Sequence, residues 1–215
     1  MPTLILLLTL LFTFSGCSSP YKNIPYSYTP APTQSRNPLS AIAPLKIKVR
    51  EFVDLRSVTN SLGSSLNSTG LKTGDILAQK PVETTLRARI ITELQRSGHK
   101  ILNTKPEFVI SGAVNEFQAE IKPYPLGREY TALITLLIEI EDPSQRIVYS
   151  HEYRTLYRDK IPTAHSVQSS NQVFSQAVDK IVAEVVSDRE IYTLFSKYQD
   201  AKKPKIKTKR HWFFF

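Results

Sequence analysis

The chain has 215 residues, of which 41% are hydrophobic and 22% are charged. This length suits one domain of ordinary size with extensions, and the composition is typical of a folded chain. The formal net charge is +9, but six basic residues lie between Lys202 and Arg210 and the rest of the chain carries 22 basic against 19 acidic residues. A nucleic-acid-binding domain carries its basic residues on a folded face, so we expect no nucleic-acid partner. Cys17 is the only cysteine, which excludes an intramolecular disulfide.

The N-terminus has the pattern of an export signal. Residues 4–14 form an apolar run that is shorter than the roughly 20 residues of a transmembrane helix but matches a signal-peptide hydrophobic region. The stretch Phe14-Ser15-Gly16-Cys17 follows and resembles the lipobox of bacterial lipoproteins. This resemblance implies that residues 1–16 are removed as a signal peptide. It also implies that Cys17 then carries acyl chains, palmitate among them, which hold the protein in a membrane.

Two features qualify this interpretation. No Lys or Arg precedes the apolar run, so a short membrane anchor or an ordinary secretory signal with a chance cysteine is the alternative. Ser18 follows the cysteine, where many inner-membrane lipoproteins have an aspartate. By that resemblance we expect the protein on the periplasmic face of the outer membrane.

Residues 17–44 are expected to form the lipidated N-terminus and a tether. This segment is rich in Ser, Pro, Asn and Tyr and shows no apolar periodicity, which is typical of a linker. Its tyrosines, Tyr21, Tyr26 and Tyr28, either dock on a partner or pack on the chain's own domain.

The folded domain is expected to span residues 45–198. Residues 45–53 alternate apolar and charged side chains, which predicts a strand with one wet face. Residues 54–80 are polar and rich in Ser, Thr, Asn and Gly, so they form either a mobile functional loop or short strands. Apolar residues at helical spacing then predict a helix from Pro81 to Gly98, followed by a short strand at 100–102.

Three longer strands and two helices complete the predicted domain. The strands cover residues 108–121, 130–140 and 147–158, separated by turns at 123–127 and 142–144. A helix begins near 169–171 and carries a broad apolar stripe, and a shorter helix covers about 188–198. The order β-α-β-β-β-β-α-α predicts an α+β fold. We expect a two-layer sandwich, with a mostly antiparallel sheet of 4–5 strands and helices packed on one face.

The sequence shows no pattern that indicates catalysis. The four histidines lie in four different segments without metal-ligand spacing, and no phosphate-binding loop or nucleophile motif is present. We therefore expect no enzyme activity, no metal and no cofactor.

Residues 45–198 resemble the YajG-like family of bacterial outer-membrane lipoproteins. The resemblance is carried by the lipobox, by Asp54 and Arg56 followed by Leu62-Gly63, by the helix ending at Gly98, by the strand hairpin and by the closing helix. It implies location and shape but no activity. Asp54 and Arg56 form either a local ion pair that fixes the loop exit or a contact to a ligand or partner.

Residues 199–215 form a basic tail with an aromatic end. Such a tail is either solvated or an interfacial anchor, with cations on lipid phosphates and aromatic rings at the headgroup level. The residues for such membrane-surface contact are Lys207, Lys209, Arg210, Trp212 and Phe213.

The sequence thus predicts a non-enzymatic lipoprotein of the cell envelope, anchored to membrane lipid through Cys17, that binds or scaffolds an envelope protein partner. The alternative is an auxiliary lipoprotein subunit of an ABC-type lipid transport system. The two differ in one feature, because a lipid carrier needs an apolar groove between helices and sheet whereas a scaffold has a filled core.

Overall fold

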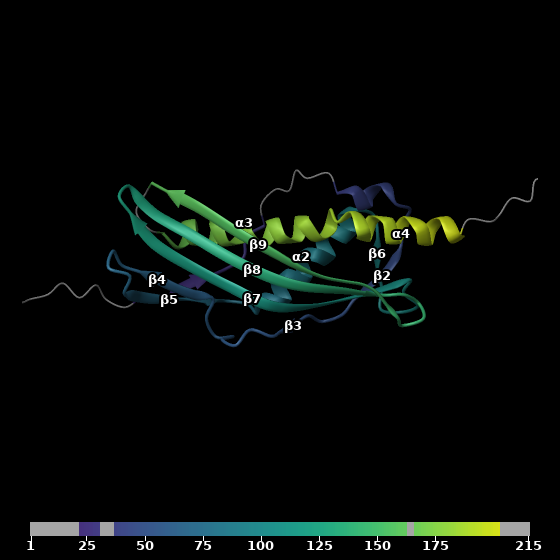
Figure 1. Cartoon of the computed structure of the whole chain (residues 1–215), viewed down its shortest axis with the longest axis horizontal. Helices are drawn as coiled ribbons and strands as arrows, with labels where there is room; N and C mark the ends of the chain where they lie inside the picture. Colours follow the sequence, from purple (N-terminus) through teal and green to yellow (C-terminus); the bar gives the residue numbers. More distant parts are fainter. Residues whose placement is uncertain (1–21, 31–36, 163–165, 203–215) are drawn as a thin grey trace, which may run out of the picture.

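The computed structural model describes residues 22–30, 37–162 and 166–202, in which α-helices lie against one large open sheet (Figure 1). Within these ranges the fold is mixed α/β, with nine strands and three α-helices. The strands are β1 (Ile24–Tyr26), β2 (Lys46–Val49), β3 (Val53–Asp54), β4 (Gly63–Leu66), β5 (Lys72–Ala78), β6 (Lys100–Ile101), β7 (Phe108–Tyr124), β8 (Gly127–Glu141) and β9 (Ile147–Ile161). The helices are α2 (Val82–Arg96), α3 (Val167–Val186) and α4 (Arg189–Lys202), with a short 3-10 helix η1 (Pro38–Ala41).

The three longest strands form the antiparallel meander that the sequence predicts. β7 pairs with β8 and β8 with β9, each over most of its length. A two-residue turn joins β7 to β8, and the Asp142 carboxylate accepts the backbone N–H groups of Ser144 and Arg146 to shape the next turn. Alternate residues of β8, from Tyr130 to Ile140, are fully buried, which gives the sheet its core-facing side.

The remaining strands make the sheet larger than predicted. β2, β3 and β4 pair one after another with the free edge of β7, all in the parallel direction. β6 extends β2 and β5 extends β4, and β1 adds to β5. The prediction of a mostly antiparallel sheet of 4–5 strands is therefore wrong in strand number. Five strand pairings are parallel, three of them because residues 46–66 run along β7 in its own direction.

All three α-helices contribute to one core layer against the sheet. α3 contacts β8 and β9, and α2 contacts β7 and α3. Side chains of η1, α2, α3 and α4 meet the buried side of β7 and β8 around Phe195 of α4. Ser166 caps α3 by accepting the backbone N–H of Ser169, and Gly98 ends α2 with a positive φ of 89°.

Part of the segment 17–44 packs on the domain, which is the second of the two alternatives, for Tyr26 and Tyr28; Tyr21 lies outside the described residues. Tyr26 is buried, with its ring against Phe117 and Phe174, and the Tyr28 hydroxyl donates to Asp179 at 2.6 Å. Leu39 and Ile42 are buried as well. In the ranges 22–30 and 37–44 the chain is therefore part of the folded unit.

Candidate functional site

The segment between β3 and β4, residues 55–62, is the candidate site and is called the 55–62 loop below. β3 pairs with β7 at Ala113 and Val114, and β4 rejoins β7 at Ala119. Between these points β7 has a bulge after Val114, where its register against β8 shifts. The loop therefore leaves the sheet beside a kinked stretch of β7 and returns five residues further along it.

Arg56 holds the loop in place from inside. Its Nε and Nη2 atoms donate to the two carboxylate oxygens of Asp54 at 2.9 and 2.8 Å. Its Nη1 donates to the carbonyl of Ser61 at 3.1 Å and Nη2 also reaches the carbonyl of Thr59 at 3.3 Å. The Arg56 side chain is only 6% exposed. Of the two alternatives for Asp54 and Arg56, the geometry supports the local ion pair, because the guanidinium is directed at its own loop.

The environment of Asp54 stabilises its charged form. Burial by itself raises the pKa of a carboxyl group, but the hydrogen bonds from the Arg56 side chain and backbone outweigh this effect. The pKa of Asp54 is consequently held below its usual value. The pair is thus ionised at neutral pH and fixes the loop electrostatically.

Leu62 and Gly63 close the loop. The Leu62 N–H donates to the carbonyl of Ile76, and the Leu62 carbonyl accepts the N–H of Ala119. These two hydrogen bonds fix the end of the loop between β5 and β7. Gly63 has φ of 150°, and a Cβ at this position would lie 1.8 Å from the carbonyl oxygen of Ala119. Only glycine allows this approach. The four sequence features Asp54, Arg56, Leu62 and Gly63 therefore act together to shape one loop.

The fixed loop and the strand that leads into it present apolar side chains to solvent. Val53, Leu55 and Val58 are each more than half exposed, although Val53 is in a strand. An open hollow of about 440 Å³ lies on one side of the loop, between Val58 and the bulge of β7. A second, of about 380 Å³, lies on the other side toward the start of α2. Arg56 lines both hollows.

The space between the helices and the sheet is filled. The cavity found there is lined only by apolar side chains and has a volume of about 10 Å³. This is barely the room that one water molecule needs and far below the 300–1,000 Å³ of a typical ligand site. Within the described ranges no helix is long and apolar enough to cross a membrane, and no three metal-binding side chains converge.

The profile of a family described as uncharacterized lipoprotein matches residues 31–195. The chain belongs to this family. Membership indicates a lipid-anchored protein of the cell envelope. The predicted signal peptide, the lipobox residues, Cys17 and the tail residues of this lipoprotein from Lys207 to Phe213 lie outside the described residues.

Solved structures share the fold of this lipoprotein at low sequence identity. The protein XCC0632 from Xanthomonas campestris is 14% identical with a TM-score of 0.57, over 84% of this chain and 98% of the other. Weaker likenesses are a minor lipoprotein from Acinetobacter baumannii (14%, TM-score 0.42, 69% and 93% covered) and a putative lipoprotein from Caulobacter crescentus (14%, TM-score 0.38, 66% and 93% covered). The first shows a common fold and the other two support no inference. No curated protein matches the sequence.

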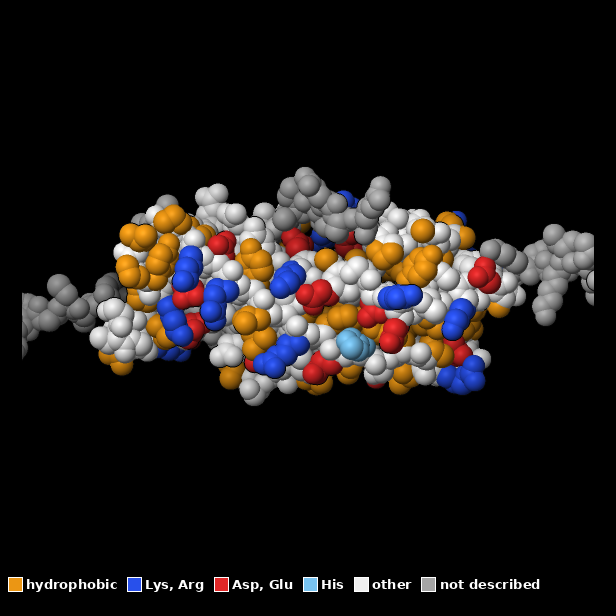
Figure 2. Space-filling view, turned by 45° about the horizontal axis from the view of Figure 1, so that its top comes forward, with side chains coloured by type: hydrophobic (Ala, Val, Ile, Leu, Met, Phe, Trp, Pro, Cys, Tyr) orange, Lys and Arg blue, Asp and Glu red, His pale blue; other side chains and the backbone are white. Residues whose placement is uncertain are grey.

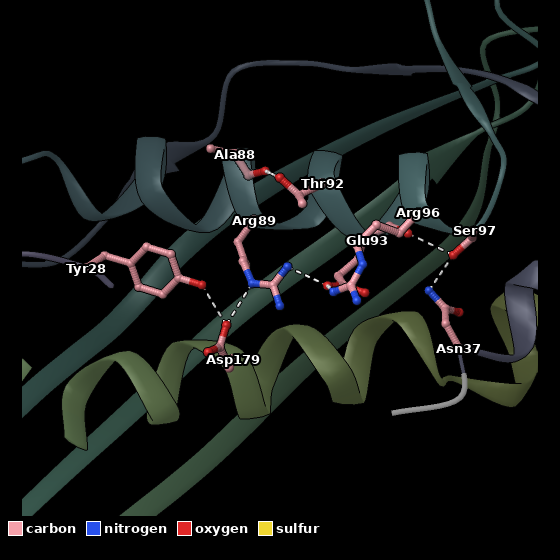
Figure 3. A network of polar contacts seen from close by, with 9 residues as sticks. All are labelled: Tyr28, Asn37, Ala88, Arg89, Thr92, Glu93, Arg96, Ser97 and Asp179. Carbon is pink, nitrogen blue, oxygen red and sulfur yellow. Dashed lines mark hydrogen bonds and ion pairs between the residues drawn. The ribbon is translucent and has the colours of Figure 1, made fainter. Parts of the chain in front are cut away.

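A buried polar network joins α2, α3 and the N-terminal segment of the lipoprotein (Figure 3). Arg89 of α2 donates to Asp179 of α3 at 2.7 Å and pairs with Glu93 one turn along its own helix. Tyr28 donates to the same Asp179 carboxylate, so the network also holds residues 27–29 on the helices. The sequence carried a signal for this network, because Arg89 and Glu93 lie on the same helix face as the buried Leu86 and Ile90.

A second polar cluster links β9 to the junction of α3 and α4. The hydroxyls of Tyr149 and Tyr153 are 2.5 Å apart, and both donate to Oδ2 of Asp188. The other Asp188 oxygen accepts the N–H groups of Glu190 and Ile191 and so caps α4. Burial and the neighbouring carboxylate raise the pKa of both tyrosines, which keeps them protonated as donors.

Proposed function

We propose that this chain is a non-enzymatic lipoprotein, anchored through acylated Cys17 at the periplasmic face of the outer membrane, that binds an envelope protein through the 55–62 loop. The observation that carries the proposal is the contrast between a filled interior and a fixed loop with exposed apolar side chains. Within the family of lipoproteins we propose the YajG-like type, on the Asp54, Arg56 and Leu62-Gly63 motif.

The loop has the properties of a protein-binding surface. Exposed apolar side chains rimmed by polar groups are typical of protein contact sites. Arg56 removes most of the loop's freedom before binding, so little further entropy is lost when a partner docks. Leu55 and Val58 are then positioned as anchors, and the hollows beside the loop offer room for side chains of the partner.

Acidic and basic side chains are interspersed with apolar ones over the face that Figure 2 shows, so this face carries no field of a single sign. A lipid-carrying role in a transport system is less favoured, because an acyl chain needs a groove and the helix–sheet interface leaves about 10 Å³.

Site-specific photocrosslinking in cells tests the partner surface. A photoreactive side chain at Val58 is expected to give a discrete adduct with an envelope protein. The matched control is the same group at Leu126, which is 76% exposed in the β7–β8 turn beyond the end of β7. Equal adducts from both positions, or none from Val58, would contradict the proposal.

The anchor is tested by Cys17→Ser. The native protein is expected to incorporate labelled palmitate and to sediment with the outer membrane, and the variant to lose both properties. Recovery of the native protein with the inner membrane would disprove the proposed location.

We also propose that the tail provides a second, weaker membrane contact through Lys207, Lys209, Arg210, Trp212 and Phe213. Lys202 pairs with Glu107 and belongs to the folded domain, so a deletion of residues 203–215 keeps this pair. This deletion is expected to reduce binding to anionic vesicles of the Cys17→Ser protein. Unchanged vesicle binding would remove the tail from the proposal.

A further inference from the structure

β9 is the outermost strand of the sheet and its far edge is unpaired in the described part of the chain. It has 15 residues and pairs only with β8. From Tyr149 to Ile161 its register against β8 is regular, and it contains neither Pro nor Gly. Natural proteins usually shorten, bend or cover such an edge, because its free backbone groups are a template for another strand.

The pairing of the neighbouring strands shows which groups point outward. The carbonyls of Ile110 and Val114 on β7 accept bonds from Arg50 and Leu55, on the side away from β8. Because antiparallel ladders alternate, the residues of β8 opposite these two, Ile140 and Leu136, direct their backbone groups to β9. Odd-numbered residues of β9 therefore bond β8, and even-numbered residues from Ser150 to Lys160 turn their N–H and C=O groups outward.

The outward edge has few partners of its own. The Lys180 ammonium contacts the Leu156 carbonyl at 3.4 Å, and the Lys160 N–H donates to the adjacent Asp159 side chain. Both contacts are exposed to solvent, so an incoming strand can replace them. The remaining outward groups between Ser150 and Arg158 are available to a strand.

We propose that β9 pairs antiparallel with β9 of a second copy, about a two-fold axis at Thr155. The two-fold axis must pass through a residue position. An axis between two residues would set an even-numbered residue, whose backbone groups point outward, opposite an odd-numbered one, whose backbone groups bond β8. Axes at Glu152, Arg154 or Arg158 set like charges opposite each other, and an axis at Leu156 sets Arg154 opposite Arg158. Only axes at Tyr153 and Thr155 place Glu152 opposite an arginine.

The axis at Thr155 pairs more of the regular segment than the axis at Tyr153. The regular segment from Tyr149 to Ile161 is centred on Thr155, so every residue of this segment finds a partner. Glu152 then lies opposite Arg158 of the second copy, and His151 lies opposite Asp159, each pair occurring twice. Opposite charges directly across an antiparallel pair stabilise it, and like charges destabilise it. The result is one continuous sheet through two copies.

Disulfide crosslinking in cells that make two differently tagged full-length copies tests this register. Ser150→Cys in one copy and Lys160→Cys in the other are expected to form a mixed disulfide, because these exposed residues are opposite each other about Thr155. The matched control combines Ser150→Cys with Leu156→Cys, which are opposite only about Tyr153. A stronger mixed disulfide in the control, equal yields, or crosslinks from Ser150→Cys to another protein would overturn the proposal.

Charge reversal provides the second test on the same reporter pair. Glu152→Arg or Arg158→Glu alone is expected to lower the Ser150–Lys160 crosslink about fivefold, because two attractive pairs become repulsive. The double variant restores opposite charges and is expected to restore the yield. If the double variant crosslinks no better than either single variant, the proposed pairing is wrong.

Discussion

Replacing Arg56 by alanine is expected to destabilise the fold and release the 55–62 loop. The guanidinium donates to the Asp54 carboxylate twice and to the carbonyls of Thr59 and Ser61. The alanine side chain has no hydrogen-bond donor that could replace the guanidinium at these oxygens. The variant therefore leaves a carboxylate and two carbonyls without these donors at a partly buried site.

The magnitude follows from the burial of the pair. Hydrogen bonds to charged groups contribute about 1.5–3 kcal/mol each, and removal of one partner from a fully buried pair costs about 3–5 kcal/mol. The Asp54 side chain is 15% exposed, so water partly compensates the lost bonds. We expect a decrease in the free energy of unfolding of about 3 kcal/mol, at the lower end of that range.

Urea unfolding at pH 7 measures this change, and hydrogen exchange of residues 55–62 reports the loop itself. The matched control is Arg50→Ala, which removes an ion pair with Glu141 whose arginine is 46% exposed. An exposed pair contributes only about 0.2–1 kcal/mol. If Arg56→Ala costs no more than Arg50→Ala, Arg56 does not hold the loop.

The same pair predicts a pH dependence. The pKa of Asp54 lies below its unfolded value of about 3.9, so its stabilising effect is complete above that pH and is lost as the pH falls through the lower, folded-state pKa. The difference in stability between the native protein and Asp54→Asn is expected to shrink between pH 7 and pH 3. A constant difference over this range would contradict the role of the charge.

Three further substitutions probe the contacts around the site and the core. Gly63→Ala is expected to cost about 3 kcal/mol or more because its Cβ meets the backbone of β7, whereas Gly70→Ala, with open space around it, is expected to cost about 1 kcal/mol for its positive φ. Arg89→Leu leaves Asp179 and Glu93 without this partner and is expected to cost about 3 kcal/mol, measured by urea unfolding. Tyr153→Phe removes one donor to a carboxylate and is expected to lower the free energy of unfolding by about 1–2 kcal/mol, and an unchanged stability would show that its hydroxyl is dispensable.

The elements with strong local patterns could be predicted from the sequence. β7, β8 and β9 alternate apolar and polar residues over many positions, and α3 carries a continuous apolar stripe, so period alone identifies them. The sequence also singled out Asp54 and Arg56, with a local ion pair as one of two alternatives, and the structure contains this pair. Two residues apart at a strand end, they interact locally and need no tertiary information.

The strands that the sequence left open or missed depend on distant partners. β4 contains Gly and Ser, β5 contains Gly, and both lack the β-branched runs that mark a strand. β4 forms because the edge of β7 offers backbone bonds, and β5 then pairs with β4. β1 contains Pro25 within a proline-rich segment, and an edge position next to β5 tolerates it. The exposed apolar side chains of the loop were missed for a related reason, since exposure depends on where the loop leaves the sheet.

One measurement tests the central claim most directly, that an acylated Cys17 delivers a fixed 55–62 loop to an envelope protein. A photoreactive group at Val58 is placed in the native chain, in Arg56→Ala and in Cys17→Ser, and the adduct is quantified in intact cells at matched protein levels. We predict a discrete adduct in the native chain, a several-fold weaker one in Arg56→Ala and none in Cys17→Ser. The same adduct at the same yield in all three chains would contradict both the anchor and the loop.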